Sequence, residues 1–175
     1  MFKSAVSAAQ RKRALDLEGK RSGFLNFKLK ILDKLVFSKV RARLGGRLRY
    51  AFSGGAAISR EVAEFIDDTG ILVYEGYGLS ETSPMATANC PGHRKIGSTG
   101  KALPHVEVII DTGAVSGTMG DQGEILVKGP NVMKGYHNLP DKTAEVMRED
   151  GAFRTGDLGR LDSEGFLFIT GRIKE

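Results

Sequence analysis

The chain has one cysteine, no tryptophan and three histidines, and it lacks any long run of apolar residues. Because Cys90 stands alone, an internal disulfide is excluded, and this cysteine usage is typical of a cytosolic protein. His93, His105 and His137 are too scattered to indicate a metal site. A transmembrane helix would need about 20 consecutive apolar residues, and the N-terminus lacks the apolar core of a signal peptide. We therefore expect a cytoplasmic protein.

The excess of lysine and arginine, a net charge of +5, is concentrated before Ser53. Such a basic segment could attract phosphates, anionic lipid heads or nucleic acid. The alternative is a solvated helix face, or a surface that meets other parts of a larger protein. Aromatic residues do not interleave with the charges as a nucleic-acid platform requires, so we favour the alternative and expect no nucleic-acid partner. The basic residues are Lys3, Arg11, Lys12, Arg13, Lys20, Arg21, Lys28, Lys30, Lys34, Lys39, Arg41, Arg43, Arg47 and Arg49.

One long amphipathic helix is expected near the start of the chain. From residue 24 to residue 44 apolar side chains recur at helical spacing, while lysines and arginines fill the other face. Gly45 and Gly46 follow directly and should end the helix. Residues 1–22 contain helix formers but only a thin apolar stripe, so they predict a helix or a frayed arm.

A strand, a helix and a second strand come next. Residues 48–52 and 71–74 have the composition of strands, and between them Ser59 is placed to cap a short helix that Gly70 ends. Strands that alternate with helices predict a sheet of the α/β class. Open α/β sheets usually bind ligands at their strand ends, so we expect the site there.

After residue 100 the pattern becomes that of strands joined by tight turns. Residues 105–110, 124–128 and 166–170 are rich in apolar and β-branched side chains, and Asp/Gly turn signals separate them. A short helix is expected from residue 140 to about residue 148, with proline at a favourable first position. This part of the chain predicts a small, mostly antiparallel β unit.

The densest cluster of functional residue types follows the second expected strand. Residues 74–82 read Tyr-Glu-Gly-Tyr-Gly-Leu-Ser-Glu-Thr. Glycines let the backbone approach a ligand closely, because no side chain intervenes. Tyr77 offers a flat face for a base. Ser80 and Thr82 offer hydroxyl donors for phosphate oxygens, and Glu81 offers a hard oxygen for Mg²⁺. The set predicts nucleotide chemistry.

This segment resembles the nucleotide-binding signature of the adenylate-forming enzymes, which include acyl-CoA synthetases, luciferases and the adenylation domains of peptide synthetases. A single glycine-rich string would be weak support, since such strings recur by chance. Four stretches agree in order, however: residues 74–82 and three others. Together they cover roughly residues 44–175. The wording of residues 37–49 is most similar to long-chain fatty acyl-CoA synthetases. The other three stretches are residues 53–57 (Ser-Gly-Gly-Ala-Ala), 154–157 (Arg-Thr-Gly-Asp) and 171–175 (Gly-Arg-Ile-Lys-Glu).

The resemblance implies a two-step, AMP-forming ligase reaction. The carboxylate of a fatty acid attacks the α-phosphate of ATP, which gives an acyl-adenylate and pyrophosphate, and the thiol of coenzyme A then displaces AMP. Because the first step brings two anions together, metal ions and fixed donors should do most of the catalytic work. The expected cofactors are ATP, Mg²⁺ and coenzyme A, and the expected substrate is a fatty acid.

The resemblance also implies roles for individual residues. Glu81 is the expected Mg²⁺ ligand, with a surface glutamate as the alternative, and Thr82 is the expected donor to the α-phosphate. Tyr77 should lie against adenine unless it only packs in the core. Asp157 should accept hydrogen bonds from the ribose hydroxyls unless it only caps a turn, and Arg172 should donate nearby unless it only forms a surface ion pair. The remaining expected residues are Gly54, Gly55, Ala56, Gly76 and Gly78 around adenine, and Lys174 at a hinge pivot.

The resemblance further implies a division of the chain and a fold for its second half, where the family has a distorted β-barrel. We expect four segments with different roles. They are a basic helical segment (1–44), an α/β segment with the adenine and phosphate motif (45–100), an antiparallel β subdomain with the ribose-binding aspartate (101–170) and a hinge to a C-terminal domain (171–175).

Two elements of the family have no counterpart in this sequence. These are a Ser/Thr/Gly-rich phosphate loop that ends in Pro-Lys, and the C-terminal domain beyond the hinge. We therefore expect a fragment that binds nucleotide weakly, turns over nothing detectable alone, and self-associates through apolar surface that its parent covers. Two alternatives stay open: a non-catalytic nucleotide-binding module, and a basic module that contacts membrane surfaces peripherally.

Overall fold

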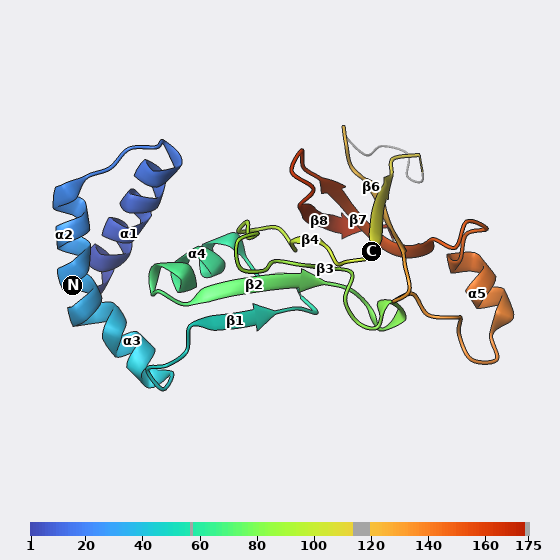
Figure 1. Cartoon of the computed structure of the whole chain (residues 1–175), viewed down its shortest axis with the longest axis horizontal. Coiled ribbons are helices and arrows are strands. Elements are labelled where there is room, and N and C mark those ends of the chain that lie inside the picture. Colours follow the sequence, from blue (N-terminus) through green and yellow to red (C-terminus); the bar gives the residue numbers. More distant parts are fainter. Residues whose placement is uncertain (57, 114–119, 174–175) are drawn as a thin grey trace. The chain divides into compact units, whose positions relative to one another are not determined.

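The computed structural model describes residues 1–56, 58–113 and 120–173. Its helices and strands are labelled along the chain in Figure 1. Contacts divide the chain into two compact units, and each is described by itself. Unit 1 comprises Met1–Ala51 and Ser59–Val73, and unit 2 comprises Phe52–Ile58 and Tyr74–Glu175. The expected division into four segments stays a prediction.

Unit 1 contains the helices that the sequence predicts before residue 45. Helix α1 spans Phe2–Leu17, so residues 1–22 form a helix for most of their length. The expected second helix is also present, although a π-helical turn interrupts its regular hydrogen bonding. It consists of α2 (Gly23–Leu32), the π-helical turn (Asp33–Phe37) and α3 (Ser38–Arg43).

Local sequence signals determine where the second helix begins and ends. The Ser22 hydroxyl caps its first turn by accepting a hydrogen bond from Leu25 N at 3.3 Å. Gly45 and Gly46 end it, with φ values of 84° and 72° that favour glycine. Within the described residues, no helix combines the length and apolar character that a membrane span requires.

Small side chains allow the helices of unit 1 to pack closely. Ala5, Ala9 and Phe37 form a buried cluster, and Leu29 and Leu32 pack against it. The thin apolar stripe of α1 is therefore sufficient for helix packing, because alanines let α1 lie directly alongside α2 (Figure 1). The aromatic residues on the other side of α2 do not enter this core: Phe24 and Phe27 are exposed.

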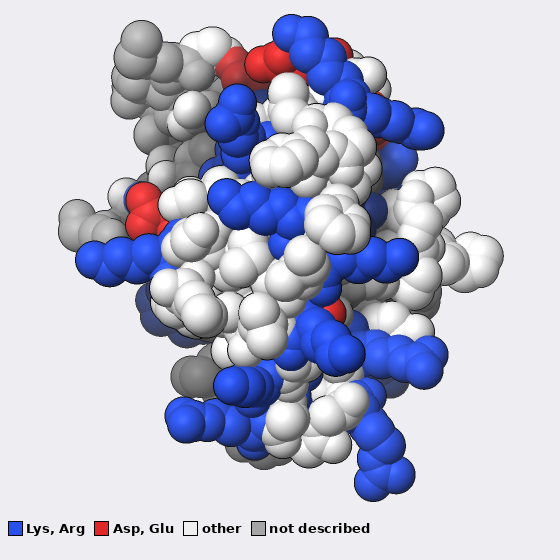
Figure 2. Space-filling view, turned by 90° about the vertical axis from the view of Figure 1, so that its left-hand side faces the viewer, with Lys and Arg blue, Asp and Glu red and all other residues white. Residues whose placement is uncertain are grey.

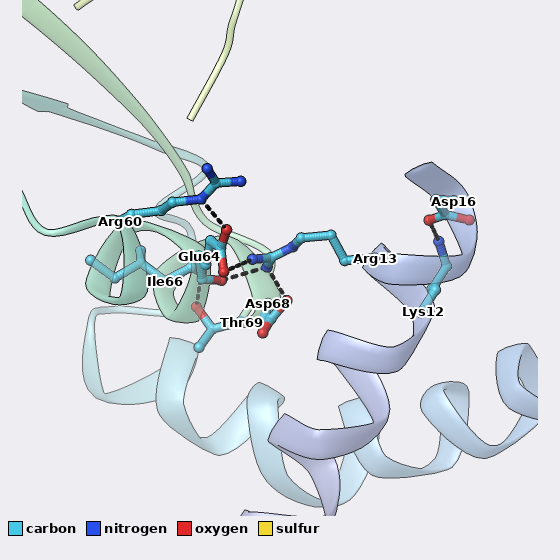
Figure 3. A network of polar contacts seen from close by, with 8 residues as sticks. All are labelled: Lys12, Arg13, Asp16, Arg60, Glu64, Ile66, Asp68 and Thr69. Atoms are coloured by element: carbon cyan, nitrogen blue, oxygen red, sulfur yellow. Dashed lines mark hydrogen bonds and ion pairs between the residues drawn. The ribbon is translucent and has the colours of Figure 1, made fainter. Parts of the chain in front are cut away.

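An arginine on α1 holds that helix against α4 (Arg60–Asp68). The Arg13 guanidinium donates to Glu64 O at 2.7 Å, lies 3.0 Å from the Glu64 carboxylate and pairs with Asp68 (Figure 3). The Asp68 side chain is only 6% exposed. Burial raises the pKa of Asp68, and the Arg13 charge opposes that rise. Arg13 therefore joins two distant parts of the sequence and does not belong to the solvated basic surface.

The strand–helix–strand prediction is confirmed. Ser59 caps α4 by accepting from Val62 N at 3.3 Å, and Gly70 follows the helix with a φ of 85°. The second strand is longer than expected, because it continues through Gly76 to Tyr77. The sheet has the order β1 (Tyr50–Ser53), β2 (Leu72–Tyr77), β3 (Thr87–Ala88) and β4 (Lys101–Ala102).

The antiparallel β unit is also confirmed. Each of its strands pairs with the next in the sequence, and the fully buried side chains of Ile125, Val127 and Leu167 form its core. The strands are β5 (Glu107–Asp111), β6 (Gly123–Lys128), β7 (Phe153–Leu161) and β8 (Leu167–Arg172).

Unit 2 differs from the prediction in one missed strand and in several boundaries. Strand β7 is not predicted, since its glycines and charged residues conceal the alternation of buried and exposed positions. The strand expected from residue 105 begins at Glu107, because His105 has a left-handed φ of 64°. Helix α5 (Pro140–Val146) ends earlier than the expected residue 148.

Candidate functional site

A cavity of about 490 Å³ lies in unit 2, where the turn after β1, the end of β2 and the β7–β8 pair meet. Most of the predicted nucleotide-binding residues line it. Gly54 instead lines a neighbouring cavity of about 320 Å³. The walls of the larger cavity are Ser53, Gly55, Ala56, Glu75, Gly76, Tyr77, Gly78, Leu79, Thr99, Asp157, Ile169, Gly171 and Arg172.

The main chain on both sides of Tyr77 packs closely against a neighbouring segment, and the chain itself requires glycine at position 78. A Cβ atom on Gly78 would lie 2.0 Å from Pro84 O, and one on Gly76 would lie 3.2 Å from Thr87 O. The main chain of residues 76–78 therefore packs closely against residues 84–87, which follow the motif. Both glycines line both cavities.

Three predicted site residues form a connected group. The Tyr77 hydroxyl donates to Asp157 Oδ2 at 2.6 Å, and Arg172 Nε donates to Asp157 Oδ1 at 2.7 Å. Asp157 and Arg172 are direct partners in the β7–β8 register, which explains the ion pair. Burial, and then the hydrogen bond to Asp157, raise the pKa of Tyr77 well above its usual range, so the phenol remains a donor.

Glu75, which is not among the residues predicted from the sequence, is a buried carboxylate in the wall of both cavities. The backbone N–H groups of Ile58 and Gly97 donate to it, and Asn89 N donates to its carbonyl oxygen at 2.8 Å. Burial raises the pKa of Glu75, while these backbone hydrogen bonds and the Arg94 charge oppose that rise. Glu75 thus fixes two loops behind the cavity. An acidic residue within a strand-like run was the available signal.

Thr82 is fully buried in the 3₁₀ turn Ser80–Thr82. Its hydroxyl accepts from Leu79 N at 2.9 Å and donates to Leu79 O at 3.0 Å. The one hydroxyl proton is therefore used within the turn, and a contact with phosphate would require that bond to be exchanged. Its role as a phosphate donor stays a prediction.

Glu81 points to a different neighbour from the cavity residues. The Tyr136 hydroxyl donates to Glu81 Oε1 at 2.9 Å. Burial, and then this hydrogen bond, raise the pKa of Tyr136. Tyr136 is not among the residues predicted from the sequence, because it lies far from the motif in the chain. Neither Glu81 nor Thr82 is among the described residues that line the cavity, and Lys174 and Ala57 lie outside the described residues.

Comparison with protein families identifies what the chain is similar to. Residues 7–137 match a family model described as AMP-binding enzyme. The long-chain-fatty-acid–CoA ligase FadD15 of Mycobacterium tuberculosis is 42% identical over 151 residues, 86% of this chain and 24% of that protein. The human long-chain-fatty-acid–CoA ligase ACSBG1 is 40% identical over 150 residues, 85% of this chain and 20% of that protein. The chain thus spans about a quarter or less of the length of these relatives.

Solved structures agree with the sequence matches. The ATP-bound MatB from Rhodopseudomonas palustris has a TM-score of 0.65 at 41% identity, covering 75% of this chain and 27% of that one. The o-succinylbenzoate coenzyme A synthetase MenE from Bacillus subtilis, in complex with ATP and magnesium ion, has a TM-score of 0.62 at 32% identity. That match covers 77% of this chain and 30% of the other. The fold and the family therefore agree.

Proposed function

The chain belongs to the AMP-binding enzyme family, and from that premise we propose that its larger cavity binds the adenosine part of ATP during activation of a fatty acid. The observation that carries this proposal is the Tyr77–Asp157–Arg172 group in the cavity wall. A carboxylate accepts hydrogen bonds from two vicinal hydroxyls better than a neutral side chain does. The neighbouring aromatic ring offers a surface for the base.

The proposed reaction has two steps. A fatty acid carboxylate oxygen attacks the α-phosphorus of ATP, the bond to the β-phosphate bridging oxygen breaks, and pyrophosphate leaves. The coenzyme A thiol then loses its proton and attacks the acyl carbon, which releases AMP. In this scheme Tyr77 and the Gly76–Gly78 main chain hold adenine, and Asp157 holds the ribose. The named ligase relatives favour a fatty acid as the substrate.

Glu81 is the proposed ligand of Mg²⁺, and its surroundings fit that ion. Mg²⁺ usually keeps several waters and takes one or two carboxylates together with phosphate oxygens, so a single glutamate is a sufficient protein contribution. Within the described residues, Tyr136 is the one hydrogen-bonding partner of the Glu81 carboxylate. When bound, the ion would neutralise phosphate charge during the first step.

Calorimetric titration with a non-hydrolysable acyl-adenylate mimic tests the adenosine site. We expect Asp157→Ala to weaken binding by about 1–3 kcal/mol, the cost of leaving hydrogen-bonding partners unpaired. Asp141→Ala, an exposed aspartate in the first turn of α5, is the matched control and should bind as the unmodified chain does. Equal affinities of all the proteins would refute the assignment of Asp157.

We propose peripheral contact with anionic membranes as a second function, because of one face of unit 1. Phe24 and Phe27 on α2 are 80% and 65% exposed, and Ile31 and Leu35 continue the apolar stripe. Figure 2 shows many lysine and arginine side chains on this side, and few acidic ones. A basic, apolar helix face of this kind fits the surface of an anionic bilayer.

Vesicle sedimentation tests this second proposal. Binding to vesicles with anionic lipid should fall at high salt, because screening weakens surface electrostatics. Phe24→Ser/Phe27→Ser should reduce binding at every salt concentration. Light scattering on the same samples measures self-association, the other expected use of this face. A chain that stays monomeric and does not bind anionic vesicles would contradict both the expected self-association and the proposed membrane contact.

A further inference from the structure

A loop between β6 and α5 fixes the main chain of the turn that carries Glu81. Met133 N donates to Glu81 O at 2.8 Å. Asn131 Nδ2 donates to Thr82 O at 3.1 Å and to Met85 O at 3.0 Å. The turn is therefore positioned by a segment that is about fifty residues away in the sequence. All of these bonds form within the chain itself.

The same loop also contacts the Glu81 side chain, through Tyr136. The phenol donates to Glu81 Oε1 at 2.9 Å. Tyr136 itself is held from behind, because its N–H donates to Thr143 Oγ1 of α5 at 2.9 Å. Gly135 allows this close approach: its φ is 149°, and a Cβ there would lie 2.8 Å from Thr143 Cγ2. Thr143 of α5 thus helps to position Tyr136, and the Tyr136 hydroxyl in turn orients the Glu81 carboxylate.

The chemical type of this partner is informative. An arginine or lysine at this place would orient the carboxylate but would also cancel its charge. A phenol, with an ordinary pKa of about 10, is neutral at neutral pH and donates a single hydrogen bond. The phenol therefore does not neutralise the Glu81 carboxylate, and within the described residues it is hydrogen-bonded to Oε1 alone, which leaves Oε2 to face a cation. A group that orients a metal-binding side chain in this way typically strengthens metal binding.

From these contacts we infer that Tyr136 is a positioning residue, which holds the Glu81 carboxylate in the orientation that a nucleotide-bound divalent cation requires. The inference rests on the proposed function, since it takes Glu81 as the metal ligand. Tyr136 touches neither the nucleotide nor the reacting atoms in this scheme. It acts through Glu81.

The test measures Mn²⁺ binding by electron paramagnetic resonance, with and without an ATP analogue whose α–β bridge is methylene. Tyr136→Phe removes the hydroxyl and keeps the ring. We expect it to weaken Mn²⁺ binding in the presence of the analogue by about 10-fold, without changing the affinity for the analogue in the absence of metal. Asn131→Ala, which removes bonds to the main chain of the turn but leaves the Tyr136–Glu81 bond, separates general loosening of the turn from the orientation of the carboxylate.

The possible results separate this inference from the proposed function. If Glu81→Gln loses Mn²⁺ binding and Tyr136→Phe retains it fully, Glu81 is the ligand and the inference is wrong. If Tyr136→Phe weakens metal-free nucleotide binding as much as Mn²⁺ binding, Tyr136 is only a structural tie and the inference is again wrong. If Glu81→Gln retains full Mn²⁺ binding, or the unmodified chain shows no nucleotide-dependent binding, the proposed metal role fails and the inference fails with it.

Discussion

The hydrogen bond between Tyr77 and Asp157 should contribute measurably to the stability of unit 2. Tyr77→Phe keeps the ring but removes a 2.6 Å bond to Asp157 Oδ2. A hydrogen bond to a charged group contributes about 1.5–3 kcal/mol. Arg172 still pairs with Asp157 at 2.7 Å, but its side chain is 58% exposed, so it compensates poorly for a lost buried donor. We expect the free energy of unfolding to fall by about 2 kcal/mol.

A double-mutant cycle with Asp157→Ala isolates this bond. Urea denaturation of the four proteins, followed by circular dichroism, gives the coupling energy between the two positions. A group whose folded-state pKa is raised keeps its contribution at every pH below the unfolded value, which is 10.0 for Tyr77. The coupling should therefore be constant from about pH 6 to about pH 9.

Two results would contradict this reasoning. A coupling energy below about 0.5 kcal/mol would mean that the bond is energetically insignificant. A coupling that declines well below about pH 9 would mean that the Tyr77 phenol ionises in that range, contrary to the effect of its burial and of Asp157.

Three further substitutions test other parts of the structure. Gly78→Ala should abolish binding of the adenylate mimic, because its Cβ would lie 2.0 Å from Pro84 O. Gly23→Ala, at the start of α2 and with no atom within 4 Å of its Cβ, should bind normally in the same titration. Arg13→Met should destabilise unit 1 by about 3 kcal/mol in urea denaturation, since it leaves Asp68 buried without its cation. Lys12→Met, which breaks only an exposed pair, should cost under about 1 kcal/mol. Glu75→Gln should flatten the pH dependence of unfolding. The pKa of Glu75 is raised above its ordinary 4.5, so the unmodified chain should lose stability as the pH rises through the folded-state value, whereas glutamine has no proton to lose. Equal slopes in urea denaturation from about pH 4 to about pH 7 would contradict this account.

The elements with strong local signals could be predicted from the sequence. Ser59 and Gly70 delimit α4 because a hydroxyl cap and a left-handed glycine act within one turn of the helix. Strand β7 could not be predicted in the same way. It contains Gly156 and Gly159, and its buried positions include Thr155 and Asp157, so its pattern is not hydrophobic. Its hydrogen-bonded pairing with β6 and β8 stabilises it as a strand, although its composition does not predict one.

The candidate site shows the same limit. Tyr77 and Asp157 could be selected from residue type and motif order, and the structure brings them together. Tyr136 has no local signal, and the one signal for Glu75, an acidic residue within a strand-like run, does not reveal its role, because the importance of both depends on partners that are distant in the sequence. Glu75 is defined by the N–H groups of Ile58 and Gly97, and Tyr136 is defined by Glu81.

The course of the chain through residues 74–82 explains why the two roles proposed for this motif should be separable. Up to Tyr77 the chain is a strand, which presents the tyrosine to the cavity and to Asp157. It then enters the 3₁₀ turn Ser80–Thr82, which changes its direction and presents Glu81 to Tyr136 instead. Since the two side chains have different supports, their contributions should respond to different substitutions. Asp157→Ala should weaken binding of the nucleoside and leave the role of Glu81 in Mn²⁺ binding intact. Tyr136→Phe should weaken Mn²⁺ binding and leave binding of the nucleoside unchanged. Similar losses of both properties in both variants would mean that the motif acts as one rigid unit.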